Sequence, residues 1–177
     1  MSTPTGTAGA GTTEVILDIE VAMATAPGLS KIMVYEGVNS AQGVLNTYAA
    51  IANDNLAKEV STSWGLAEAN TSPSFRSSEN TIFLQMASQG QSLFAASGDN
   101  GAYDNGTSLS VDDPASQPYV TAVGGTTLSA NTSGAYIAEA SWGTTSNRTG
   151  GGGGVSSVWT QPSYQAGLAT TANQACP

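Results

Sequence analysis

The sequence predicts an α/β fold in which a parallel sheet is flanked by helices. Short apolar segments alternate with longer segments of helical spacing, which is the pattern of strand–helix–strand units. The chain has 177 residues and 40% of them are hydrophobic, enough for one domain with a buried core. Because the sequence starts in a loop-like segment and stops without a closing element, we expect residues 1–177 to be part of a larger domain, with a sheet incomplete at both ends.

The first third of the chain already shows this alternation. Residues 1–12 are small and mostly uncharged, so we expect a flexible loop there, before an α/β core over residues 13–177. A helix is expected from residue 13 to about residue 26, because Pro27-Gly28 stops it. The apolar run 31–35 (KIMVY) then predicts a strand.

The middle of the chain continues the pattern. The spacing of apolar residues over 40–53 predicts a second helix, and 59–64 predicts a strand. A third helix is expected over about 77–89, followed by a buried strand at 92–97 (SLFAAS). These elements form the expected parallel sheet and its helical cover.

After Gly98 the alternation of strands and helices ends. Short β-like segments at 119–123, 126–130 and 135–140 are separated by turns. The glycine run 150–154 fits a flexible linker, but ordered segments on both sides favour a loop whose backbone passes close to another part of the protein.

The charge balance restricts the partners. Thirteen acidic residues face four basic ones, for a net charge of -9. So few cations cannot neutralise a phosphate backbone, and we expect no nucleic-acid partner. No apolar run approaches about 20 residues, so we also expect no membrane span. Few charged side chains with abundant Gly, Ser, Thr and Asn are typical of secreted proteins that work in acid, although any acidic soluble protein fits equally well.

Two residue types limit the possible mechanisms. The chain contains no histidine, so no Ser-His-Asp or Cys-His arrangement can form within it. Its one cysteine, Cys176, excludes a thiolate zinc site and an internal disulfide; it is either a free thiol or half of a bridge to a partner beyond the chain. We expect no metal site in this chain, because residues 99–106 lack the calcium-loop pattern.

Three groups of residues are candidates for chemistry. Glu14 and Asp18 lie four residues apart on the first expected helix, which places two carboxyl groups on one face, close enough to share a proton. Two solvated surface acids would give the same spacing. Asp99 follows an apolar strand in a Gly-rich turn, which is where α/β folds present functional side chains, although a structural Asx-turn would look alike.

The third candidate is Ser63-Trp64-Gly65 at the end of an expected strand. A buried tryptophan at a strand end is the simpler interpretation. The alternative is the edge of a cleft, where an exposed strand end pairs with an extended peptide.

Together these segments resemble the sedolisin family, the serine-carboxyl peptidases with a subtilisin-like fold. The similar segments occur in family order and span most of the chain: 14–28 (EVILDIEVAMATAPG), 31–35 (KIMVY), 61–65 (STSWG), 95–101 (AASGDNG), 112–126 (DDPASQPYVTAVGGT) and 152–165 (GGGVSSVWTQPSYQ).

The resemblance implies a role for each candidate. Glu14 would be the general base that takes the proton of a serine nucleophile, and Asp18 would hold and tune Glu14 through a shared proton. Asp99 would complete the oxyanion hole, and it can donate a hydrogen bond only while protonated, so acid pH becomes part of the mechanism. Ser63, Trp64 and Gly65 would line the peptide-binding cleft.

The sequence also departs from the family pattern. The nucleophile motif G-T-S-x-x-x-P is missing after the glycine run, and Gly106-Thr107-Ser108 lies in the wrong context to replace it. We therefore expect this chain alone to be inactive. The calcium site that the resemblance implies belongs to a C-terminal region of the family domain, and no cofactor is expected in this chain; the resemblance also implies a propeptide.

Three functions are compatible with the residues. The first is a secreted, acid-acting endopeptidase or tripeptidyl-peptidase that hydrolyses peptide bonds through an acyl-enzyme. The alternative is a non-catalytic secreted binding relative of the same fold, which downstream sequence without a G-T-S-x-x-x-P motif would favour. The third is a glycosidase with paired carboxylates about 5–9 Å apart across a sugar cleft, but an i, i+4 pair on a helix without several cleft aromatic residues fits it poorly.

Overall fold

The computed structural model describes residue 9, residues 11–144 and residues 148–167. Most of the expected N-terminal loop (1–8 and 10) and Cys176 lie outside this part. The chain divides into two compact units, Met1–Tyr35 and Glu36–Pro177, which we call the first and second units and describe separately. In the described residues no helix is both long and apolar enough to cross a bilayer.

The first unit is built on α1 (Thr12–Thr25), which confirms the first expected helix to within a residue at each end. Gly11, with φ 99°, occupies the N-cap in the left-handed region, where glycine adopts the backbone without strain. The apolar side chains Ile16 and Leu17 are 48% and 51% exposed, and no side chain of α1 is buried.

The strand expected over residues 31–35 is wrong. The structure gives residues 31–38 neither helix nor strand. An apolar run of this length fits a buried strand in sequence, but a strand exists only where a neighbour completes its backbone ladder. This segment lies at the boundary of the two units and forms no such ladder with the described residues.

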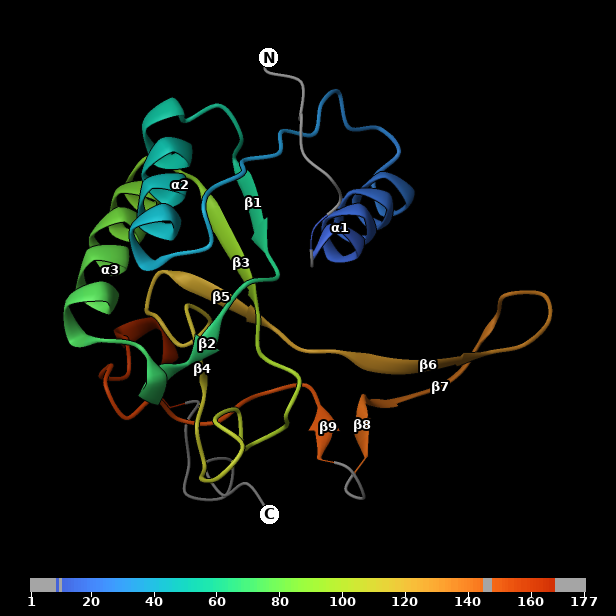
Figure 1. The fold of residues 1–177 in the computed structure, drawn as a ribbon. Coiled ribbons are helices and arrows are strands. Elements are labelled where there is room, and N and C mark those ends of the chain that lie inside the picture. Colours follow the sequence, from blue (N-terminus) through green and yellow to red (C-terminus); the bar gives the residue numbers. More distant parts are fainter. Residues whose placement is uncertain (1–8, 10, 145–147, 168–177) are drawn as a thin grey trace. The chain divides into compact units, whose positions relative to one another are not determined.

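The second unit is organised around a parallel three-stranded sheet, as the sequence predicts (Figure 1). Its strand order is β1 (Glu59–Thr62), β3 (Ser92–Ala96) and β5 (Val120–Val123). The helices α2 (Ala41–Asp54) and α3 (Pro73–Ser88) pack against each other on one side of this sheet.

The core of the second unit lies between these helices and the sheet. Along β3, Leu93 and Ala95 are buried while their neighbours are more exposed, which is the two-residue alternation of a strand with one covered face. Phe83 of α3 is completely buried and meets Tyr48 of α2 edge to face, with ring centroids 5.0 Å apart.

Helix α3 begins at Pro73, four residues before the expected start at residue 77. Ser72 is its N-cap and its Oγ accepts a hydrogen bond from the backbone N–H of Phe75 at 3.2 Å. Serine at the N-cap followed by proline at the first helical position is a common start signal, so the sequence contained the information.

We expect Ser72→Ala to lower the free energy of unfolding by about 1 kcal/mol, because the N–H of Phe75 loses its acceptor. Urea unfolding followed by circular dichroism measures this change. Ser77→Ala, an exposed position inside the same helix, is the matched control and should change little. Equal effects of the two substitutions would contradict the capping role.

Short antiparallel pairs complete the second unit. The segments expected at 126–130 and 135–140 are confirmed as the hairpin β6 (Thr126–Ala130) and β7 (Tyr136–Ser141). The sequence did not predict two pairs of very short strands and two single-turn 3₁₀ helices: β2 (Leu66–Ala67) with β4 (Asp112–Asp113), β8 (Gly143–Thr144) with β9 (Thr149–Gly150), η1 (Glu68–Asn70) and η2 (Ser163–Gln165).

Candidate functional site

The two acids of the first unit lie on α1. Glu14 and Asp18 are four residues apart within a continuous helix, so the helix places both on one face. Glu14 is partly buried and Asp18 is exposed. The structure thus supplies the helical spacing on which the expected acidic pair depends.

Asp99 lies just past β3, at the carboxyl edge of the parallel sheet. Gly98 before it has φ +93°, a left-handed conformation that turns the chain sharply away from the strand. The side chain of Asp99 is exposed, while its backbone oxygen accepts a hydrogen bond from Gly150 N at 2.8 Å. An exposed carboxyl group on a fixed backbone is a suitable arrangement for a group that contacts a ligand.

The glycine run fixes this turn from the other side. Gly152 N donates to Gly98 O at 3.0 Å, and a Cβ added to Gly152 would lie only 1.8 Å from the backbone oxygen of Ser97. Only glycine permits so close an approach. The close approach expected for the glycine run 150–154 is therefore confirmed.

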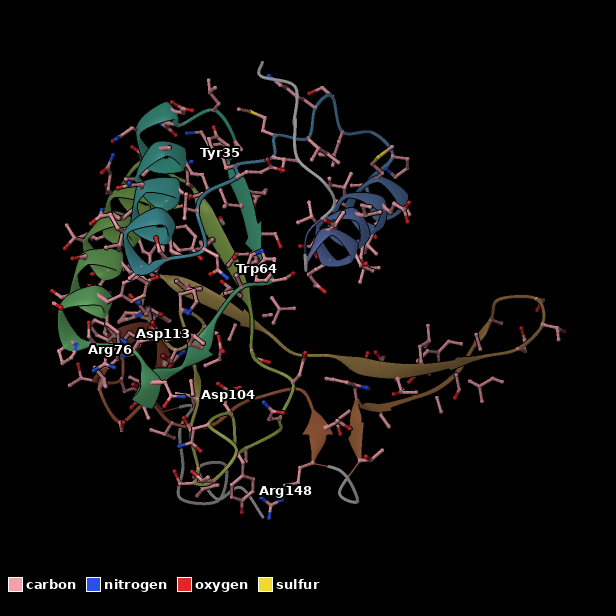
Figure 2. All side chains as sticks on the ribbon, viewed as in Figure 1. Tyr35, Trp64, Arg76, Asp104, Asp113 and Arg148 are labelled. Atoms are coloured by element: carbon pink, nitrogen blue, oxygen red, sulfur yellow. The ribbon has the colours of Figure 1, made fainter. Side chains whose placement is uncertain are left out.

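Ser63, Trp64 and Gly65 follow β1 at the same edge of the sheet. Thr62 of β1 lies opposite Ala95 of β3 in the parallel register, so the segments that carry Trp64 and Asp99 leave the sheet in the same direction. The indole of Trp64 is 53% exposed, which excludes the simple buried-tryptophan interpretation (Figure 2).

A pair of acidic residues that the sequence analysis did not identify contacts the segments that carry Trp64 and Asp99. Asp104 and Asp112 are within side-chain hydrogen-bond reach of each other. A Cβ added to Gly65 would lie 2.2 Å from Asp112 Oδ1, and one added to Gly98 would lie 2.5 Å from Asp104 Oδ1. The pair therefore contacts the backbone next to Trp64 and the backbone next to Asp99.

A second acidic pair lies deeper, between α3 and β4. Glu79 and Asp113 are 1% and 3% exposed and are within hydrogen-bond reach of each other. Gln117 Nε2 donates to Glu79 Oε2 at 3.0 Å and to Asp113 Oδ1 at 2.9 Å. The residues are far apart in sequence, so spacing alone could not reveal them.

Burial and mutual repulsion make both pairs bind protons strongly. Burial, with the neighbouring charge of Asp104, raises the pKa of Asp112 to about 8. Burial, with the charge of Asp113, raises the pKa of Glu79 to about 9. Each pair therefore holds a proton at acid pH. Two carboxyl groups need this proton to form a hydrogen bond with each other, because ionised carboxylates only accept.

A third buried acid has a different environment. Glu68 is 2% exposed, but its carboxylate accepts hydrogen bonds from Ser116 Oγ, Ser156 Oγ and both N–H and Oγ of Ser157. Four donors satisfy the charge without a cation, as buried carboxylates require. This contact attaches the segment after the glycine run to η1.

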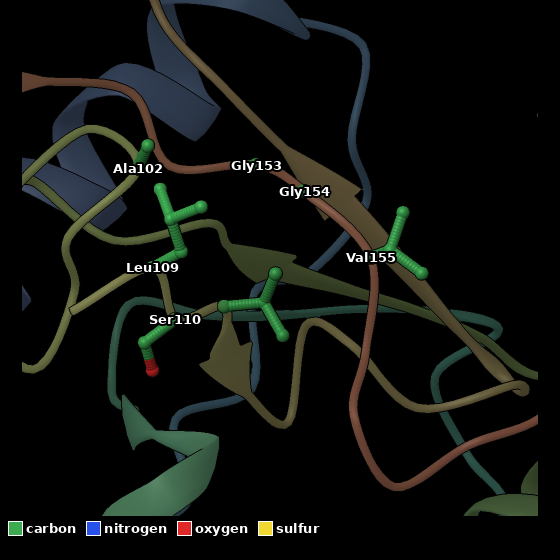
Figure 3. Close-up of a pocket in the computed structure, with 7 residues that line it drawn as sticks. Ala102, Leu109, Ser110, Gly153, Gly154 and Val155 are labelled. Carbon is green, nitrogen blue, oxygen red and sulfur yellow. The ribbon is translucent and has the colours of Figure 1, made fainter. Parts of the chain in front are cut away.

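A shallow hollow of about 250 Å³ lies beside the loop that follows Asp99 (Figure 3). It is lined by Ala102, Leu109, Ser110, Val111, Gly153, Gly154 and Val155. None of the candidate site residues lines it. Ser108, in the same loop, is exposed and its Oγ accepts a hydrogen bond from Asn105 Nδ2 at 2.7 Å.

The described residues contain no group of three His, Cys, Asp or Glu side chains placed to hold a metal ion.

Comparison with known proteins decides the family. The profile of the subtilase family matches residues 5–142. Kumamolisin from Bacillus sp. (strain MN-32) is 40% identical over 166 residues, which cover 92% of this chain and 30% of kumamolisin. The chain belongs to the sedolisin group of the subtilase family. Sedolisin from Pseudomonas sp. (strain 101) is 34% identical over 172 residues, which cover 88% of this chain and 29% of sedolisin.

A solved sedolisin structure agrees with this assignment. Pseudomonas sedolisin, a serine-carboxyl proteinase complexed with two molecules of pseudo-iodotyrostatin, matches with a TM-score of 0.83 and 31% identity, over 91% of this chain and 48% of that chain. The predicted subtilisin-like α/β fold is confirmed. The present chain spans only about 30% of the length of kumamolisin.

Proposed function

We propose that this chain supplies the acidic part of the active centre of a serine-carboxyl peptidase that hydrolyses peptide bonds at acid pH. The observation that carries the proposal is the position of Asp99, exposed at the carboxyl edge of the sheet on a turn fixed by the glycine run. The similarity to kumamolisin, sedolisin and tripeptidyl-peptidase 1 supports the reaction class.

The proposed mechanism gives each candidate residue one role. A serine outside this chain attacks the peptide carbonyl, and Glu14 takes the proton of that serine as general base. Asp18 stabilises the protonated form of Glu14. Asp99, while protonated, donates a hydrogen bond to the oxyanion, and the exposed Trp64 segment lines the cleft with Ser63 and Gly65. Water then hydrolyses the acyl-enzyme.

Several properties of the complete protein follow from the proposal. Its substrate is a peptide or protein, its location is extracellular, and a propeptide precedes the catalytic domain. The nucleophile lies beyond this chain, so residues 1–177 alone are inactive. Endopeptidase and tripeptidyl-peptidase activities are both compatible with these residues, and tripeptidyl-peptidase 1 is among the proteins similar to this chain.

The pH dependence of the complete protein tests the role of Asp99. We expect kcat/KM to be highest at about pH 3–5 and to fall toward neutral pH, because a carboxyl group in an oxyanion hole donates a hydrogen bond only while protonated. Asp99→Asn should extend activity to higher pH, because an amide donates at any pH, and Asp99→Ala should lower kcat by about 100- to 1,000-fold.

An undiminished rate at about pH 8 would contradict the acid mechanism, and an unchanged profile in Asp99→Asn would remove Asp99 from the oxyanion role. Asp54→Asn, an exposed acid at the end of α2, is the matched control and should leave the profile unchanged. Binding of peptides without any hydrolysis would favour the non-catalytic binding relative instead.

A further inference from the structure

The pair Asp104–Asp112 links the segments that follow the neighbouring strands β1 and β3, beyond the last paired residues Thr62 and Ala95. Asp112 is the first residue of β4, and its carboxyl group contacts Gly65, the residue after Trp64. Asp104 belongs to the loop after Asp99, and its carboxyl group contacts Gly98. A residue larger than glycine at either position would displace the carboxyl group, since an added Cβ would lie 2.2 Å from Asp112 Oδ1 or 2.5 Å from Asp104 Oδ1.

A bond between two carboxyl groups requires a proton. Ionised carboxylates only accept hydrogen bonds, so Asp104 and Asp112 attract each other while one proton is shared and repel when it is lost. The titratable groups that face the pair are Asp99, Asp113 and, farther off, Glu79 and Tyr48. Each of these carries negative charge when ionised. Burial, with the charges of Asp104, Asp113 and Asp99, raises the pKa of Asp112 to about 8.

One oxygen of the pair is buried without a donor. Asp112 Oδ1, in a residue only 7% exposed, has no hydrogen-bond donor among the described residues, and it is the atom closest to Gly65. An ionised carboxylate with a desolvated oxygen in that position is unfavourable, whereas a protonated acid carries no full charge there.

We propose that Asp104 and Asp112 are positioning residues, and that the single proton they share holds the Gly65 and Gly98 backbones, and with them Trp64 and Asp99, in the arrangement seen here. The inference deepens the proposed function, because Trp64 and Asp99 belong to the proposed peptidase site. When the proton passes to bulk solvent, repulsion between the two carboxylates separates the segments after β1 and β3. The site is thus assembled at acid pH by a group that is not itself in contact with substrate.

Fluorine NMR of the complete protein labelled with fluorotryptophan tests the proposal without relying on catalysis. Loss of one resonance in Trp64→Phe assigns the signal of Trp64. In the native protein we expect this signal to change with a midpoint near the pKa of Asp112, about pH 8. In Asp112→Asn, where the amide donates to Asp104 permanently, the change should disappear or its midpoint should move by more than about one pH unit.

Asp104→Asn is the second variant, and it should also abolish the transition or move its midpoint, since an amide at either position removes the shared proton. Glu59→Gln, which removes an exposed carboxylate from β1, is the matched control and should keep the native midpoint. If the pair only stabilised the fold, Asp112→Asn and Asp104→Asn would shift the resonances of Trp142 and Trp159 together with that of Trp64. The pH midpoint of the Trp64 signal would then stay at its native value.

Two results would overturn the proposal. One is a Trp64 signal that does not respond between about pH 5 and pH 9 in the native protein. The other is the native midpoint in both Asp112→Asn and Asp104→Asn. Either result, obtained with an enzyme that still hydrolyses peptides in acid, would reject the positioning role and leave the proposed function standing.

Discussion

Raising the pH from about 4.5 to about 9 is expected to lower the free energy of unfolding, on the order of 2–4 kcal/mol of it through Glu79. The side chain of Glu79 is 1% exposed and faces Asp113, so the folded protein holds its proton far more tightly than the unfolded chain does. Between its unfolded pKa of 4.5 and its folded pKa of about 9, the native state binds more protons than the unfolded state, and stability falls as pH rises.

Glu79→Gln separates this contribution from the rest. Glutamine has almost the same shape, can donate to Asp113 without a titratable proton, and keeps the position next to Gln117. We therefore expect a much flatter dependence of stability on pH, with the variant about as stable as the native protein near pH 4.5 and more stable near pH 9. Urea unfolding at a series of pH values measures both curves.

Exposed acids provide the comparison for this experiment. Asp54→Asn should follow the native curve, because Asp54 is exposed in the folded protein. Asp112→Asn should remove a further part of the slope, between the ordinary pKa of 3.8 and about 8. Parallel curves for the native protein and Glu79→Gln would show that this pair does not hold a proton.

The strands and helices of the second unit were predictable because their signals are local. The alternation over 92–97 and the helical spacing over 40–53 are each contained within one element, and both elements form where expected. The position of Asp99 followed from the same logic, since parallel strands present their carboxyl ends at one edge.

The glycine run and the start of α3 illustrate two different cases. The run 150–154 was correctly assigned to a close approach because ordered segments flank it, although the sequence did not show that its partner is the Asp99 turn. The earlier start of α3 was a missed local signal, since Ser72-Pro73 is a capping pair with a clear mechanism.

The contacts of the buried acids could not be predicted, for a physical reason. Gln117 donates to Glu79 across 38 positions, and Ser157 donates to Glu68 across 89. Contacts of this kind depend on how the loops pack over the sheet, and no periodicity in the sequence records them. The same reason explains why the strand expected over residues 31–35 was wrong. The run is apolar, but a strand also needs a neighbouring strand elsewhere in the chain.

Removing the carboxyl group of Glu14 is expected to have the largest effect on activity. In the complete protein, Glu14→Gln should lower kcat/KM by about 100- to 10,000-fold if Glu14 is the proposed general base, because an amide cannot take a proton from serine. Asp18→Asn should have a smaller effect, since in the proposed mechanism Asp18 acts through Glu14. Steady-state hydrolysis of a peptide substrate across the acid range measures both variants.

Helix α1 offers a matched control for this prediction. Glu20 lies on the same helix and is exposed, but it is six residues from Glu14 and two from Asp18, so helical geometry places it on a different face. Glu20→Gln removes the same charge from the same helix and should leave kcat/KM unchanged. If Glu14→Gln and Glu20→Gln behave alike, the i, i+4 pair is only a surface feature, and the base must be sought elsewhere. A loss confined to Glu14 and Asp18, with circular dichroism unchanged, assigns the chemistry to one face of α1.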